Sequence, residues 1–166
     1  ILLIGLLFIS SLLSLQAQPK EEIRATWLTT LGGMDWPTRK ANSAKGIEAQ
    51  KNELIRQLDA LKAANFNTVL FQTRLRGDVI YPSAIETFAE SLTGHTGKNP
   101  GYDPLQFAIE ECHKRGLELH AWLVCIPIGN KRQVTLLEKN CVVKKQPALC
   151  KQFNGQIGRA SCRERV

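Results

Sequence analysis

Two apolar segments of the chain carry side chains that can bind a polar ligand. In the first segment, Gln72, Arg74 and Arg76 occupy every second position. In the second segment, His120 and Trp122 are spaced in the same way. With two residues that follow the first segment, the set is Gln72, Arg74, Arg76, Asp78, Tyr81, His120 and Trp122. Amide, imidazole and guanidinium groups hydrogen-bond hydroxyls, and a flat aromatic ring stacks on the apolar face of a pyranose. The set therefore indicates a site for a sugar.

These residues also have structural readings. Arg74 and Arg76 can pair with Asp78 or with a later acidic residue to hold a loop, because structural ion pairs are common. His120 can be a core histidine bonded to a backbone carbonyl, and Trp122 is a core residue if it faces the helices. The residue types alone leave both readings open.

A further apolar segment, nearer the start of the chain, contributes Trp27, Thr29, Asp35 and Trp36, the last of which can simply plug a loop. Hydrolysis of a glycosidic bond normally needs two carboxyl groups that flank the bond. Asp35 and Asp78 are the acids near the carboxyl end of a predicted strand, and we assign both to substrate positioning or loop structure. The catalytic residues are therefore unassigned. No cysteine or histidine spacing predicts a metal site, and no cofactor is expected.

Alternating strands and helices must position these residues. Runs of apolar and β-branched residues predict strands at residues 23–30, 68–74 and 117–125. Helical spacing of leucines and other apolar residues predicts helices at 48–64 and 103–116. The order β-α-β-α-β gives parallel strands joined by right-handed crossovers, and ligands of such sheets bind at the carboxyl ends of the strands.

The predicted fold class is α/β, namely the N-terminal fragment of a (β/α)₈ TIM barrel, comprising about three βα units with parallel strands. A complete barrel needs about 250 residues, and three strands with two helices cannot close one. Residues 75–102, which are rich in Gly, Ser and Thr, predict a long functional loop, and 134–139 a short helix.

The two ends of the chain differ in character from its middle. Residues 1–17 are uncharged and apolar, which is typical of a secretory signal peptide, although a buried helix is the alternative. The missing Met and basic start indicate that this leader is truncated. Residues 156–166 match the translation of a common sequencing adapter rather than a natural basic tail, so the barrel portion is expected at 22–155. We expect an exported protein with no membrane span after signal cleavage.

The net charge of the chain bears on the class of partner. The tail holds three arginines and one glutamate, so without it the net charge falls from +7 to +5, spread without a basic block. No nucleic-acid partner is therefore expected, although weak attraction to an anionic wall polymer stays open.

Cys141 and Cys150 are candidates for a local disulfide, whereas Cys112 and Cys125 are read as small core residues.

Three stretches of the chain resemble one known family. IRATWLTTLGGMDWP, NTVLFQTRLRGDVIYPS and NPGYDPLQFAIEECHKRGLELHAWL resemble, in this order, the glycosyl hydrolase-like 10 family of bacterial exported proteins. The resemblance implies a (β/α)₈ barrel and activity on a glycan, with bacterial cell-wall polysaccharide as the candidate substrate. It carries over only the seven residues named above, as substrate-binding positions. The acidic motif that looks like the family's catalytic centre follows a fourth strand and is absent from this sequence. An Asn-Pro turn of many members is replaced here by Val124-Cys125-Ile126-Pro127, so an Asn ligand is absent too.

The expected function is therefore that of an exported glycoside hydrolase acting on a polysaccharide or oligosaccharide. This chain lacks the catalytic carboxylates and is expected to be inactive by itself. The alternative is a carbohydrate-binding barrel without catalysis. A nucleotide-binding domain is disfavoured, because TTLGGMDWP lacks the G-x-G-x-x-G spacing and does not open directly into a helix.

Overall fold

The computed structural model describes residues 22–137 and 139–159. The expected signal peptide at 1–17 lies outside the described residues, as does most of the tail.

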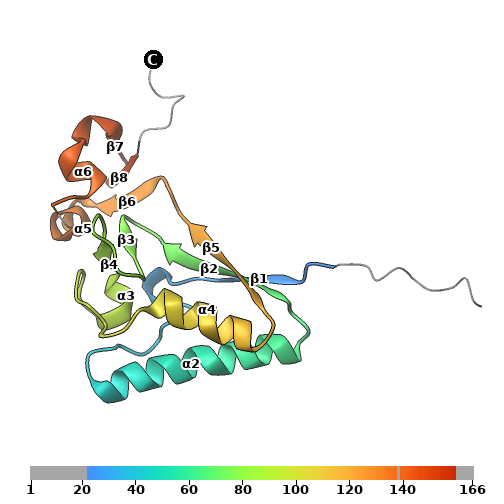
Figure 1. The fold of residues 1–166 in the computed structure, drawn as a ribbon. Helices are drawn as coiled ribbons and strands as arrows, with labels where there is room; N and C mark the ends of the chain where they lie inside the picture. The colour runs from blue at the N-terminus through green and yellow to red at the C-terminus, as the bar shows by residue number, and fades with distance from the viewer. Residues whose placement is uncertain (1–21, 138, 160–166) are drawn as a thin grey trace, which may run out of the picture.

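A parallel sheet forms the centre of the fold. β1 (Ala25–Leu28), β2 (Thr68–Arg74) and β5 (Glu118–Leu123) all run in the same direction, with β2 in the middle. Their carboxyl ends therefore meet at one edge (Figure 1). The mixed α/β class and the parallel pairing agree with the prediction from alternating strands and helices.

Two helices cover one face of this sheet (Figure 1). α2 (Ala44–Ala63) begins earlier than its apolar spacing predicts, because the Ser43 hydroxyl accepts a hydrogen bond from the Gly46 N–H at 3.1 Å and caps the first turn. α4 (Pro104–Lys114) begins where predicted, with the Asp103 carboxylate capping two backbone N–H groups. The caps thus fix how the loops enter both helices.

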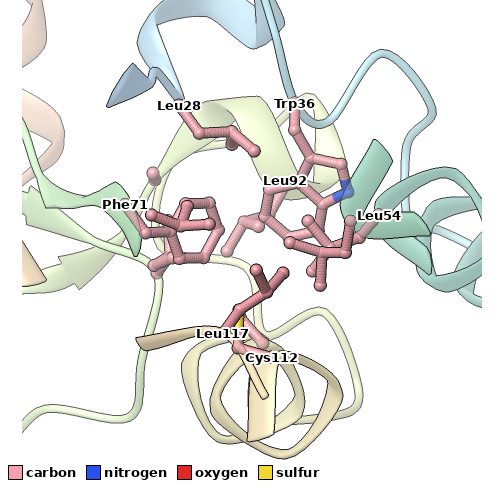
Figure 2. Packing of buried hydrophobic residues seen from close by; sticks show 12 residues of the cluster. Leu28, Trp36, Leu54, Phe71, Leu92, Cys112 and Leu117 are labelled. Carbon is pink, nitrogen blue, oxygen red and sulfur yellow. The ribbon is translucent and has the colours of Figure 1, made fainter. Parts of the chain in front are cut away.

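The hydrophobic core lies between the sheet and these helices. Leucines of α2 and residues of α4 pack against the inner side chains of β1 and β2 around Phe71 (Figure 2). Trp36 is fully buried in this cluster, and its indole N–H donates to the Gln50 carbonyl at 3.1 Å. The reading of Trp36 as a plug of the loop after the first strand is therefore confirmed.

The opposite face of the sheet is open. Side chains alternate between faces along a strand, so Trp27, Leu70, His120 and Trp122 lie on the side away from the helices. Leu70 is in register with both Trp27 and His120. Trp27 is 61% exposed, and no helix of the described residues covers this face (Figure 1).

The predicted long loop contains three short elements. β3 (Asp78–Val79) pairs antiparallel with the end of β2, and β4 (Thr87–Phe88) pairs parallel with β3. α3 (Glu90–Thr93) follows and contacts the 3₁₀ helix η1 (Leu31–Gly33) after β1. This loop therefore folds over the carboxyl edge of the parallel sheet.

A separate small unit follows β5. It consists of β6 (Pro127–Asn130), α5 (Lys131–Leu136), α6 (Val142–Lys145), the 3₁₀ helix η2 (Pro147–Leu149), β7 (Cys150–Phe153) and β8 (Gln156–Arg159). Its strands form an antiparallel sheet in the order β6-β8-β7. The helix predicted at 134–139 lies earlier, because Asn130 and Gln133 form a capping box. β8 falls within the stretch 156–166, which the sequence assigns to the adapter.

The structure confirms the prediction for Cys112 and differs from those for Cys125 and Cys141. Cys112 is a buried core residue, as predicted. The same prediction for Cys125 is wrong, because β5 ends at Leu123 and leaves Cys125 exposed in the connection to β6. Cys141 is a buried free thiol, so the disulfide considered for it is not formed, although Cys150 packs against the same small apolar cluster.

Candidate functional site

Gln72 joins the ends of the first two strands. Its side-chain oxygen accepts hydrogen bonds from the Thr29 hydroxyl at 2.6 Å and from the Thr30 N–H at 2.9 Å. Gln72 is 2% exposed, so this amide sits inside the edge of the sheet. It holds the ends of β1 and β2 together.

Arg74 forms a partly buried ion pair with Glu86. Its guanidinium binds Glu86 through two nitrogens at 2.6–2.9 Å and donates to the Val124 carbonyl at 2.5 Å. Burial works to lower the pKa of Arg74, but the hydrogen bond and charge of Glu86 raise it overall. Of the two readings considered for Arg74, the structure thus shows the ion pair with a later acidic residue.

Arg76 and Asp78 lie in the turn beyond β2. β2 ends at Arg74, as its apolar run predicts, and Gly77, with φ of 72°, turns the chain into β3, so Arg76 does not continue the alternation of Gln72 and Arg74. The Asp78 carboxylate accepts the Arg76 N–H at 3.1 Å. Burial raises the pKa of Asp78, against the lowering effects of that hydrogen bond and of the Arg76 and Arg74 charges.

A pocket of about 300 Å³ lies beyond the carboxyl ends of β1 and β2. Its polar side chains are those of Thr30, Lys40, Thr73, Arg76, Asp78, Glu90, Ser91 and Gln133. Its apolar wall is formed by Leu31, Leu75, Ile80 and Ala89. Hydrogen-bonding groups on an apolar wall are typical of small polar ligand sites.

Tyr81 lies beside the Arg74–Glu86 pair rather than in this pocket. Burial raises the pKa of its phenol, the charge of Glu86 raises it further, and that of Arg74 lowers it. The phenol is therefore a neutral hydrogen-bonding group near neutral pH.

His120 and Trp122 belong to the open face of the sheet. The Trp122 ring stacks edge to face on Trp27, with centroids 4.7 Å apart. His120 is exposed, and its Nε2 lies 3.4 Å from the Glu118 carboxylate. No described element covers this side of β5, so both readings of His120 stay predictions for the complete protein.

The structure therefore divides the seven predicted residues into three groups. Arg76 and Asp78 line the pocket, Gln72, Arg74 and Tyr81 lie near the edge that supports it, and His120 and Trp122 face the open side. Sequence reasoning missed Lys40 and Ser91, because a lysine and a serine in polar segments give no pattern. Glu86 was foreseeable only as a later acidic partner of an arginine.

Three acids of this edge are engaged in local structure, whereas Glu90 lines the pocket. Glu86 binds Arg74, Asp78 accepts from its own turn, and the Asp35 carboxylate accepts the Thr29 N–H at 2.8 Å. In residues 22–137 and 139–159 no group of three or more His, Cys, Asp or Glu side chains is arranged to hold a metal ion. None of the helices in these ranges is long and apolar enough to cross a membrane.

The sequence of the chain matches a known protein family. Residues 22–164 match the family described as Glycosyl hydrolase-like 10. This chain belongs to the glycosyl hydrolase-like 10 family.

Two relatives of this glycosyl hydrolase-like 10 chain bear names of the same kind. It is 39% identical over 157 residues to the glycosyl hydrolase YngK of Bacillus subtilis, which covers 94% of this chain and 30% of that protein. It is 37% identical over 136 residues to the glycosyl hydrolase DigH of Escherichia coli, covering 79% of this chain and 31% of that protein. The chain thus spans about 30% of the length of these relatives.

Proposed function

We propose that this chain is the N-terminal part of an exported glycoside hydrolase that acts on a bacterial glycan, with cell-wall polysaccharide as the expected substrate. The fold proposed for the whole protein is a (β/α)₈ barrel, to which β1, β2 and β5 contribute the first three strands. Family membership, together with a polar pocket at the carboxyl edge of a parallel sheet, is the observation that carries the proposal.

In this proposal the described residues bind and position the glycan. Arg76 and Asp78 hydrogen-bond sugar hydroxyls in the pocket, while Gln72 and the Arg74–Glu86 pair hold the strand ends that carry them. Trp122 and His120 face the side where an eight-stranded barrel has its interior. The two carboxyl groups that hydrolysis needs come from strands beyond residue 155.

A second candidate is a carbohydrate-binding barrel without catalysis. It is favoured by one observation, which is that Asp35, Asp78 and Glu86 at this edge are all engaged in local structure. The two candidates differ in turnover and agree in binding.

The test uses the complete gene product. Purified bacterial cell-wall glycan is incubated with the wild-type protein, and release of reducing ends and glycan binding are both measured. Turnover supports the hydrolase, and binding without turnover supports the second candidate. If neither turnover nor binding is detected, both candidates are overturned. Because Arg76 is placed against substrate, Arg76→Met is expected to weaken binding by roughly 10-fold, the loss of a charge-assisted hydrogen bond.

A further inference from the structure

The small unit after β5 reaches the pocket through the side chain of Gln133. All other described residues that line the pocket lie between positions 30 and 94. Gln133 belongs to α5 and is half-buried. Its place in the pocket wall therefore depends on how the small unit packs against the loop after β2.

The small unit packs directly on the turn that carries two pocket residues. A Cβ at position 77 would lie 3.1 Å from the Ile128 Cγ2 and 3.3 Å from the Leu137 Cδ1, so these buried side chains rest on the backbone of Gly77. Gly77 lies between Arg76 and Asp78, which both line the pocket. The apolar cluster of the small unit thus seats this turn and brings α5 to the same pocket.

The two ends of the Gln133 amide have different surroundings. Oε1 accepts the Asn130 N–H at 2.9 Å and completes the capping box of α5. Since a backbone N–H needs an acceptor, this bond fixes which end of the amide is the oxygen. Nε2 makes no hydrogen bond within residues 22–137 and 139–159, and it is not among the buried polar atoms left without a partner there. The Nε2 donors are therefore accessible, on a side chain that lines the pocket.

Gly129 holds the Gln133 side chain in this position. A Cβ on Gly129 would lie 2.9 Å from the Gln133 Oε1 and 3.0 Å from the Gln133 Cβ, and φ of 138° also favours glycine there. The amide is thus fixed at one end by a hydrogen bond and packed against bare backbone. A side chain ordered in advance loses little entropy when it binds a ligand.

We propose that Gln133 binds substrate and that residues 127–155 form one wall of the site. The Gln133 Nε2 donates to a hydroxyl oxygen of a neutral sugar ring, and Arg76 and Asp78 meet other hydroxyls of the same ring. An amide donor suits an uncharged oxygen, because it brings no charge of its own. This inference rests on the proposed function and adds a residue and a wall of the site to it.

Gln133→Ala in the complete gene product removes the amide. KM on soluble strands of cell-wall glycan, or Kd if the strands are bound without turnover, is expected to rise about 3- to 10-fold, with any kcat within about twofold. If the wild type turns over the glycan and the variant keeps its KM, the inference is wrong and the proposed function stands. If the wild type neither binds nor cleaves the glycan, both fail together.

Asn130→Ala is the matched control for the capping box. The Asn130 side chain accepts the Gln133 N–H at 2.9 Å, but Asn130 is not among the residues that line the pocket. In this variant the backbone N–H of residue 130 can still donate to the Gln133 Oε1. The midpoint of thermal unfolding is expected to fall about as much as in Gln133→Ala, while KM stays within about twofold of the wild type. An equal rise of KM would assign Gln133 to the start of α5 alone and overturn the proposal.

Gln133→Glu separates the two ends of the amide. It keeps an acceptor for the Asn130 N–H, since glutamate is a usual residue at this place in a capping box. It removes the donor, and adds a third carboxylate to a pocket that already holds Asp78 and Glu90. The unfolding midpoint is expected to match the wild type, while KM stays raised by at least about 3-fold. A variant in which both values return to those of the wild type would rule out the contact with substrate.

Discussion

At the scale of single residues, the two arginines next to each other in the predicted pattern have different partners. Arg74 is held by Glu86 and by a backbone carbonyl, whereas Arg76 keeps its guanidinium at the pocket. Sequence spacing treats these residues alike. β2 ends at Arg74, so Arg76 lies in the turn beyond the strand. Glu86 is brought close to Arg74 only by the fold of the loop after β2.

The Arg74–Glu86 pair is expected to be a stability element. The side chains of Arg74 and Glu86 are 13% and 14% exposed, so Arg74→Met leaves a carboxylate buried without its partner. We expect the free energy of unfolding to fall by about 3 kcal/mol, measured by denaturant titration of the complete gene product, and to recover when Glu86→Leu is added. Glu22→Gln, at an exposed pair with Arg24, is the control and should cost less than about 1 kcal/mol. Weaker glycan binding by Arg74→Met at undiminished stability would instead make Arg74 a direct ligand contact.

At the scale of elements, the sequence predicted the long regular segments best. Strand β2 spans the residues that its apolar run indicates, and α2 ends within one residue of its predicted end, just before Asn65 with φ of 60°. The elements inside 75–102 were not foreseen, because two-residue strands such as β3 are too short to show periodicity and depend on pairing with β2. Since these elements build the pocket, the same limit explains why Ser91 was missed.

One cluster of charges joins the two helices behind the sheet. Glu111 of α4 accepts from Lys114 and Arg115, and Arg115 also binds Asp59 of α2 at 2.6 Å. Hydrogen bonds from Lys114 and then Arg115 lower the pKa of Glu111, against the effect of burial. The folded state therefore favours the ionised carboxylate more than the unfolded state does.

Glu111→Gln is expected to lower stability near neutral pH by roughly 1–2 kcal/mol. Because the folded pKa of Glu111 lies below its ordinary value of 4.5, the contribution is full above that value and is lost as pH falls through the folded pKa. The stability difference between wild type and variant, measured by thermal unfolding at a series of pH values, should shrink over that acidic range. Glu110→Gln, an exposed neighbour on α4, is the control and should change stability by less than about 0.5 kcal/mol. A difference independent of pH would contradict the assignment.

At the scale of the whole molecule, the sheet has one covered and one open face. Helices α2 and α4 bury one side (Figure 1). Trp27, His120 and Trp122 lie on the other side. The direction and order of the strands followed from the sequence, because alternation of strands and helices permits few connections. How the open face is covered does not follow from it, since this chain spans about 30% of its relatives.

The proposed barrel makes a prediction about backbone protection. Within the described residues β1 and β5 each pair only with β2, which is itself paired on both sides. In a barrel the free edges of β1 and β5 pair with further strands, so their amides become protected. Hydrogen exchange followed by mass spectrometry on the complete gene product and on the segment 22–155 compares the two states.

We expect exchange in peptides covering β1 and β5 to slow by at least about 10-fold in the complete protein, and β2 to be much less affected. β2 serves as the internal control, because a change of the same size there would indicate that the shorter segment has lost its fold. Peptides of β1 and β5 that exchange equally fast in both proteins, with β2 protected in both, would mean that these edges stay free and that the sheet does not close into a barrel.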